Sequence, residues 1–303
     1  MAPPSRPNVA GTAKLLVVLL GFAWGFNWIA AFYALQEVPP WSLRFVSTGL
    51  GALTLLAAAY VSGHRLAGTA VQFKHITVAG FLNVSVFNIC AAFAQIFGAT
   101  SRAVVITYSM PIWAAALTWL VFGDRLDKMR IGALVLCIAG LAILVGPLFM
   151  RGAPLGVVFV LGCAFAWTLA TVYMRWADID IDPLVNAMWQ LLIGTALIAI
   201  GMLAVEGAPR VWPLRITSAM AMLYIALFGT GLAHFLWWSI VGKLPTVTAS
   251  LGSLLVPVVG VTASTVLLGE RPTVTDIVGF ALIFAAAACV LLQRSVKHTE
   301  MPE

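Results

Sequence analysis

The chain has 303 residues, of which 62% are apolar and only 9% are Asp, Glu, Lys or Arg, whereas soluble domains have about 45–50% and about 25%. This composition excludes a soluble globular fold, because too few polar side chains are present to cover the surface. The net charge of +6 does not require a nucleic-acid partner, since in a membrane protein such an excess serves as an orientation signal.

Ten apolar segments follow one another along the chain, most of them close to the length of about 20 residues that crosses a hydrocarbon layer as a helix. Continuous apolar runs such as 131–149 and 280–292 favour helices over the alternating strands of a β-barrel. The first segment continues without a convincing cleavage site and is predicted to be an uncleaved span. Divided at charged, Gly and Pro clusters, the predicted spans are 14–34, 40–62, 75–97, 102–122, 129–148, 154–176, 183–204, 216–241, 246–268 and 273–293.

Lys and Arg are unevenly divided between the two sets of loops. The set that includes both termini carries eleven of them, and the opposite set carries five. The positive-inside rule therefore places both termini in the cytoplasm. We predict a cytoplasmic N-terminal tail at 1–13, a first five-helix repeat at 14–148, a second, inverted five-helix repeat at 154–293 and a cytoplasmic C-terminal tail at 294–303.

The two halves repeat the same features in the same order. The superposed residues are Ala23-Trp24 on Ala166-Trp167 at an offset of 143, and Thr100 on Thr246, Pro111 on Pro257 and Gly123-Asp124-Arg125 on Gly269-Glu270-Arg271 at an offset of 146. Five helices per half is an odd number, so corresponding helices cross the membrane in opposite directions. Inverted repeats are typical of transporters, which open a midplane site to each side in turn. The alternative is that the repeat only records a gene duplication.

These motifs resemble the drug/metabolite transporter superfamily in its ten-helix EamA-type branch, over nearly the whole chain, and most of all its YddG-type bacterial aromatic amino-acid exporters. The resemblance implies an all-α polytopic bundle in which the first, third, fourth, sixth, eighth and ninth helices surround a central cavity. It also implies efflux from the cytoplasm across the bacterial inner membrane.

Polar side chains within the spans are candidates for a substrate site, because they are costly in lipid. His234 lies mid-span in the eighth segment and pairs with Asn88 under the offset of 146. Either the imidazole titrates and couples protons to transport, or it stays neutral and hydrogen-bonds a neighbouring helix. Asn27 and Asn83 are further candidates, although amides in lipid also join helices, at about 0.6 kcal/mol each. Arg44 is interpreted as structural, through snorkelling or pairing with Glu37.

Aromatic rings form the second group of candidates. Trp24 and Trp167 occupy equivalent places in the two halves, and Trp237 and Trp238 lie deep in the eighth span. Such rings stack on aromatic or apolar substrates of amino-acid size. The alternative is that these rings only pack against other helices or lipid, which is favoured for one of the adjacent Trp237 and Trp238. We assign Trp237 to the site, together with Ser253, whose hydroxyl can meet a substrate in the small-residue ninth span.

Pro111 and Pro257 are the predicted hinges, because each removes a helix hydrogen bond at an equivalent depth of the two halves. No metal site is expected, since the four cysteines have no metal-type spacing and are interpreted as buried hydrophobes.

The rival functions each need a feature that the sequence lacks. An intramembrane enzyme needs a motif such as HExxH or paired aspartates, and an ATP-driven pump needs a phosphate loop. We therefore predict a secondary transporter without cofactor that exports small metabolites, foremost aromatic or hydrophobic amino acids, by alternating access. The alternative is broad efflux of drugs or lipophilic cations, which would require a membrane-embedded carboxylate. A more distant alternative is an intramembrane enzyme. The partners are the small substrate and the bilayer, with no nucleic acid, and two fused halves make an oligomer unnecessary.

Overall fold

The computed structural model describes residues 9–123, 128–150, 154–241 and 255–292. All regular structure in these ranges is helical. In chain order the elements are α1 (Val9–Leu35), α2 (Pro40–Val61), α3 (Ala70–Gly80), η1 (Phe81–Val86), α4 (Phe87–Phe97), α5 (Thr100–Thr107), α6 (Met110–Phe122), α7 (Lys128–Met150), α8 (Pro154–Ala177), α9 (Pro183–Val205), α10 (Ile216–Tyr224), η2 (Ile225–Leu232), α11 (Ala233–Val241), α13 (Leu255–Leu267) and α14 (Val274–Leu292).

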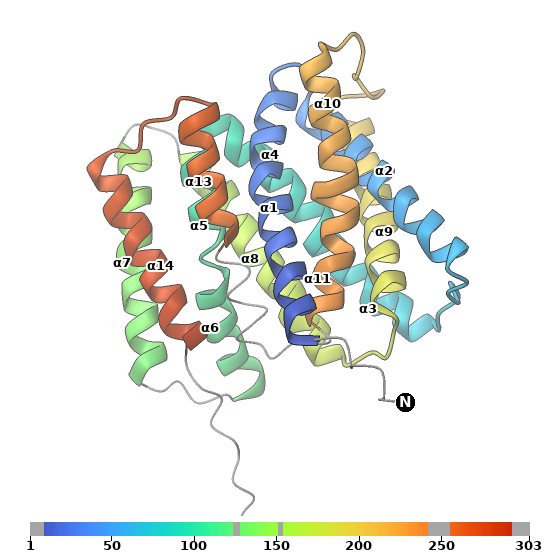
Figure 1. Ribbon diagram of the computed structural model, residues 1–303, viewed down its shortest axis with the longest axis horizontal. Helices are drawn as coiled ribbons and strands as arrows, with labels where there is room; N and C mark the ends of the chain where they lie inside the picture. The colour runs from blue at the N-terminus through green and yellow to red at the C-terminus, as the bar shows by residue number, and fades with distance from the viewer. Residues whose placement is uncertain (1–8, 124–127, 151–153, 242–254, 293–303) are drawn as a thin grey trace, which may run out of the picture.

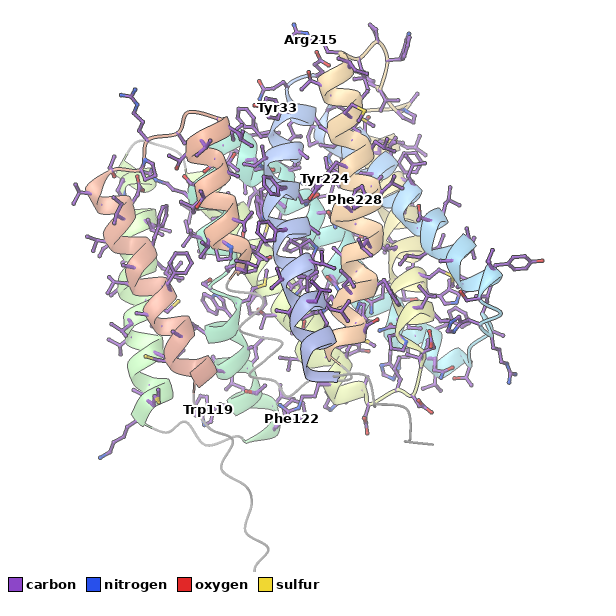
Figure 2. The ribbon with its side chains drawn as sticks, in the orientation of Figure 1. Tyr33, Trp119, Phe122, Arg215, Tyr224 and Phe228 are labelled. Atoms are coloured by element: carbon purple, nitrogen blue, oxygen red, sulfur yellow. The ribbon has the colours of Figure 1, made fainter. Side chains whose placement is uncertain are left out.

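The helices form one bundle in which neighbours pack side by side. Helices α7 and α14 pair at one edge, and α2 and α9 pair toward the other, with α1, α8 and α11 between them (Figure 1). Figure 2 places Arg215 near one end of the bundle and Trp119 and Phe122 near the opposite end. These ends are called the Arg215 end and the Trp119 end below.

The prediction of an all-helical polytopic membrane fold is confirmed. In the described part of the chain, seven helical stretches are long and apolar enough to cross a membrane, and three shorter apolar helices lie at Ile131–Pro147, Leu255–Leu267 and Val274–Ala286. Together these ten follow the order of the predicted spans. Three spans are composite: α3, η1 and α4 form the third, α5 and α6 the fourth, and α10, η2 and α11 the eighth.

Two of the composite spans contain a π-helical segment, which the sequence pattern did not predict. The segments are η1, Phe81–Val86, and η2, Ile225–Leu232. Under the offset of 146, η1 corresponds to the last six residues of η2. A π-helix shifts hydrogen bonds to i→i+5 and is frequently found at functional sites. The two segments therefore indicate that the third and eighth spans contribute to a functional site.

Two glutamates cap helix N-termini at the Arg215 end. Glu206, which follows α9, accepts from the backbone N–H groups of Trp41 (2.9 Å) and Ser42 (2.8 Å) in α2. Glu270, which follows α13, accepts from the N–H groups of Thr100 (2.7 Å) and Ser101 in α5. The first N–H groups of a helix lack internal partners and favour a negative charge. Each glutamate thus ties a helix of one half to a helix of the other.

The four cysteines are free thiols. Cys137 and Cys163 are buried, as predicted, whereas Cys90 and Cys289 are only partly buried, which corrects the prediction for those two.

Candidate substrate site

Three tryptophans from three different spans meet in the bundle interior. The Trp24 ring of α1 lies 5.3 Å from that of Trp167 in α8, edge to face, and 5.7 Å from that of Trp237 in α11. The Trp167 and Trp237 centroids are 5.8 Å apart. Such spacings are those of attractive aromatic pairs. These residues, called the tryptophan cluster below, were all predicted as site residues, and the fold brings them together.

His234 joins this cluster. Its ring centroid lies 6.5 Å from that of Trp24 and 6.0 Å from that of Trp167. Its Nδ1 lies 2.9 Å from the carbonyl oxygen of Thr230, and because a carbonyl only accepts, Nδ1–H is the donor. The imidazole therefore bonds its own helix, which corrects the expected bond to a neighbouring helix. The opposite nitrogen, Nε2, is buried without a partner in the described part of the chain.

Asn88, in the third span, follows a residue that lies close to the cluster. The preceding residue, Phe87, has its ring 5.0 Å from that of Trp167. The Asn88 side chain donates to the carbonyl oxygen of Val84 (2.8 Å) and accepts from Nη1 of Arg44 at 3.4 Å. Arg44 does not pair with Glu37, as the sequence suggested, because Glu37 pairs with Arg215 at 3.0 Å. Nor does Arg44 snorkel outward, since only 2% of it is exposed.

The other predicted amides have different surroundings. Asn27 lies one turn after Trp24, with its buried Oδ1 against Gly229 in η2 and without a hydrogen-bond partner among the described residues. Asn83 donates to Oε1 of Gln190 in α9 at 3.1 Å. Asn83 thus joins the third and seventh spans, and its role in substrate binding stays a prediction.

The two predicted hinge prolines lie near the N-termini of α6 and α13. The fourth span is interrupted, because α5 ends at Thr107 and α6 begins at Met110, and Pro111 lies in the first turn of α6. Proline suits that position, since the missing N–H would have no helical partner there. Pro257 is the third residue of α13 and is buried. Motion at both prolines stays a prediction, and Ser253 lies outside the described residues.

Several buried polar atoms near these groups lack a hydrogen-bond partner in the described ranges. Native proteins satisfy most buried polar groups, so such atoms mark places where water or a ligand binds. The unpartnered atoms are Asn27 Oδ1, Arg44 Nε, Asn83 Oδ1, Gln95 Oε1, Thr107 Oγ1, His234 Nε2, Trp237 Nε1 and Trp238 Nε1.

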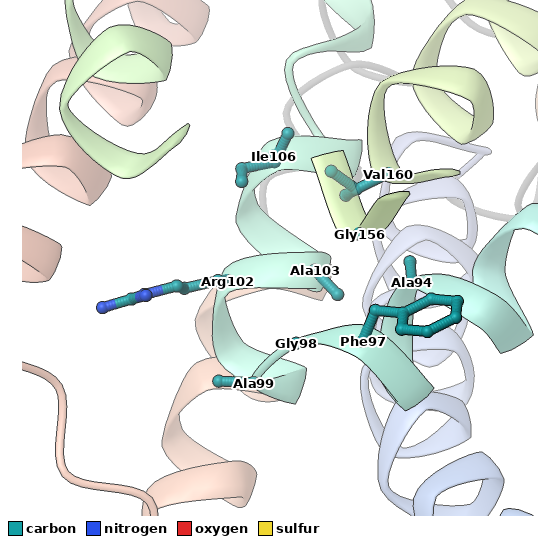
Figure 3. Close-up of a pocket in the computed structure, with 9 residues that line it drawn as sticks. All are labelled: Ala94, Phe97, Gly98, Ala99, Arg102, Ala103, Ile106, Gly156 and Val160. Carbon is teal, nitrogen blue, oxygen red and sulfur yellow. The ribbon is translucent and has the colours of Figure 1, made fainter. Parts of the chain in front are cut away.

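Two cavities lie away from the tryptophan cluster, toward the Arg215 end. Figure 3 shows the first, a space of about 10 Å³ lined by residues of α4, α5 and α8, with Phe97 and Arg102 on its opposite sides. It has room for about one water molecule. The second is an open hollow of about 370 Å³ beside Arg102, Glu270 and Asp276. Arg102 there forms a bidentate ion pair with Asp276, with Nε 2.6 Å from Oδ1 and Nη2 3.1 Å from Oδ2.

Phe87 and the two π-helical segments belong to the site region but were not predicted as site features. Phe87 directly precedes Asn88, so its neighbourhood was indicated although its ring was not. The π-helical segments leave no mark on the hydrophobic pattern. The sequence did carry a signal for the burial of Arg44. Of the 17 Lys and Arg residues, it is the one that was not counted among the loops at either membrane surface.

Comparison with known proteins identifies the fold and the family. The model of the EamA-like transporter family matches two segments, 11–146 and 154–292. An uncharacterized transporter of Bacillus subtilis, YvbV, is 25% identical over 91% of this chain and 90% of its own. A probable amino-acid metabolite efflux pump of Salmonella typhimurium is 26% identical over 91% of this chain and 92% of its own. A crystal structure of a protein with 22% identity superposes with a TM-score of 0.68 and covers 94% of this chain and 99% of that one.

Proposed function

This chain belongs to the EamA-like transporter family, and from that premise we propose that it exports amino acids with aromatic or large apolar side chains from the cytoplasm. The tryptophan cluster carries the proposal. Trp24, Trp167 and Trp237 come from three spans and present ring faces and edges that suit an aromatic side chain. The name of the Salmonella relative supports the amino-acid class.

We further propose that the halves form an inverted repeat and that transport proceeds by alternating access. The two family matches divide the chain close to the predicted repeat boundary. The cluster lies where the first, sixth and eighth spans meet, and its rings contact one another, so a substrate enters only when these helices separate. The break before Pro111 is a suitable hinge, because fewer backbone hydrogen bonds resist bending there.

The proposed location is a bacterial inner membrane with both termini in the cytoplasm. The excess of Lys and Arg on the loops that share a side with the termini supports this orientation. The Arg215 end would then face the periplasm, and export would proceed from the Trp119 end to the Arg215 end.

Efflux of lipophilic cations is the second candidate, because tryptophan faces also attract cations. Such a transporter needs a buried carboxylate, and the one most buried in the described ranges, Asp276, is held by Arg102 at the Arg215 end. The tryptophan cluster has no carboxylate among its described contacts. The observations therefore favour a neutral or zwitterionic substrate.

The test is uptake by the purified protein in liposomes. Labelled phenylalanine, tryptophan and tyrosine are compared with alanine, lysine and a lipophilic cation, with and without an imposed pH gradient. Saturable uptake restricted to the aromatic amino acids is expected. Uptake of the cation alone would replace the proposal with drug efflux, and uptake of none would remove the substrate class while leaving the family assignment intact.

A further inference from the structure

Arg44 is a buried cation without an anionic partner in the described part of the chain. It lies one turn into α2, and only 2% of it is exposed. A guanidinium has five N–H donors and stays charged in proteins. Its one hydrogen bond to a described residue is the 3.4 Å contact with Asn88 Oδ1, and Nε has none. A charge held in an apolar interior is costly unless it is paired.

The described acidic residues are engaged elsewhere or lie far away. Each of those near the Arg215 end already has its own partner, and the remaining ones lie in the loop between α8 and α9 at the Trp119 end. The engagements are Glu37 with Arg215, Asp276 with Arg102, Glu206 with the N-terminus of α2, and Glu270 with the N-terminus of α5. No protein carboxylate of the described ranges is therefore available to Arg44.

The guanidinium is linked to the tryptophan cluster through Asn88 and its neighbour Phe87. Arg44 contacts Asn88, and the neighbouring Phe87 ring lies 5.0 Å from Trp167. The Asn88 amide nitrogen donates to the carbonyl oxygen of Val84, and its neutral Oδ1 is a weak acceptor for Arg44 at 3.4 Å. A ligand carboxylate can displace this weak contact and accept two parallel hydrogen bonds from the guanidinium fork, which is the strongest geometry for this pair.

We propose that Arg44 binds the carboxylate of the transported molecule while the tryptophan cluster holds its side chain. The substrate class is thus a carboxylate joined to an aromatic or apolar group, and the inference rests on the proposed transport function. A cationic drug is disfavoured, because it would meet the positive charge of Arg44, which has no anionic partner among the described residues. The positive charge also explains how a zwitterion can be held without any acidic residue in the cluster.

The test measures how much the carboxylate of a ligand contributes to binding, by comparing competitors with and without this group. Uptake of labelled phenylalanine into proteoliposomes is competed by phenylpropionate, which lacks the amine, and by phenethylamine, which lacks the carboxylate. We expect phenylpropionate to compete at least tenfold better than phenethylamine. In Arg44→Gln, phenylalanine and phenylpropionate should each lose about tenfold in affinity, equivalent to about 1.4 kcal/mol, whereas phenethylamine should keep or improve its affinity.

Two further variants keep the test decisive if Arg44→Gln folds poorly. Asn88→Asp places a carboxylate on Arg44 from within the protein, so it should fold well and weaken phenylalanine while sparing phenethylamine. Arg102→Gln is the matched control, because it removes a different, partly buried arginine, whose ion pair is local to the Arg215 end. Its preference for carboxylates should equal that of the unmodified protein.

The outcomes distinguish this inference from the proposed function. If phenylalanine is transported but Arg44→Gln and Asn88→Asp retain the preference for carboxylates, or lose all three ligands equally, the assignment of Arg44 is wrong. If phenylalanine is not transported, thermal shifts with phenylpropionate and short aliphatic carboxylates replace uptake. Stabilisation that Arg44→Gln abolishes would support Arg44 and remove the amino-acid substrate, and stabilisation by none of the carboxylates would overturn the inference.

Discussion

Asn88 and His234 make the same hydrogen bond at equivalent positions of the two halves. Asn88 donates to the carbonyl oxygen of Val84 at 2.8 Å, and His234 donates to that of Thr230 at 2.9 Å. Each residue follows the end of a π-helical segment by two positions. Side-chain donors therefore satisfy carbonyl groups at the exit of both segments, so the two residues share a structural role despite their different chemistry.

This shared role predicts that His234 acts as a neutral donor and not as a proton carrier. Protonation of Nε2 would place a second charge in the bundle interior with no described carboxylate beside it. His234→Gln keeps a donor and should retain most of the transport rate, and its pH profile from about pH 5.5 to about pH 8 should run parallel to that of the unmodified protein. His234→Leu removes the donor and should lose much more activity. An inflection present only in the unmodified protein would instead establish proton coupling through His234.

The tryptophan cluster predicts a graded loss of affinity. Trp24→Ala removes the ring that lies edge to face on Trp167. It should raise the KM for phenylalanine by about tenfold, because an aromatic contact with the substrate contributes about 0.5–1.5 kcal/mol beyond its area. Trp24→Phe retains a smaller ring and should have a smaller effect. Trp119→Ala is the control, since that ring is half exposed on α6 and outside the cluster. Equal KM values for Trp24→Ala and Trp119→Ala would exclude a substrate role for the cluster.

The order and type of the spans were predictable because the length of an apolar run decides whether a helix crosses a membrane. The seventh predicted span, 183–204, differs from α9 (Pro183–Val205) by one residue. The first helix begins at Val9, five residues before the predicted start, because the polar tail continues the helix. The π-helical segments were missed, since a one-residue shift in backbone hydrogen bonding does not alter which residue types are apolar.

The site was predictable where the two halves repeat and unpredictable where tertiary pairing decides. Trp24 and Trp167 were found through their equivalent positions, and the fold brings them into contact. The pairing of Arg44 with Glu37 was wrong, because closeness in sequence does not decide which charged side chains meet in the fold. Only the packing of the eighth span against the first two places Arg215 on Glu37 and leaves Arg44 without an acidic partner among the described residues.

Close packing of α3 against α9 predicts a strong effect of one added methyl group. A Cβ on Gly80 would lie 2.9 Å from the carbonyl oxygen and 3.3 Å from the Cα of Gln190, and backbone atoms cannot rotate away. Gly80→Ala should therefore destabilise the protein by about 1–3 kcal/mol and lower the apparent Tm in detergent. Gly132→Ala in α7 is the matched control, because its Cβ would meet no atom within 4 Å, and it should raise the Tm slightly. Similar shifts for both would contradict the tight contact.

Glu37 predicts a specific sensitivity to acid at the Arg215 end. The backbone N–H of Arg215 is the largest cause that holds the pKa of Glu37 below its ordinary value of 4.5, followed by the side chain of Ser218. Because the folded-state pKa is lowered, the carboxylate stabilises the fold above pH 4.5, and this contribution is lost as the pH falls through the folded-state pKa.

The apparent Tm of the unmodified protein should therefore fall more steeply between about pH 6 and about pH 3.5 than that of Glu37→Gln, which has already lost the interaction at neutral pH. Asp178→Asn serves as the control, because it removes an exposed acid at the Trp119 end, and its curve should keep the steepness of the unmodified protein. If the curve of Glu37→Gln is instead as steep as that of the unmodified protein, the contact between Glu37 and Arg215 does not contribute to the stability of this end of the bundle.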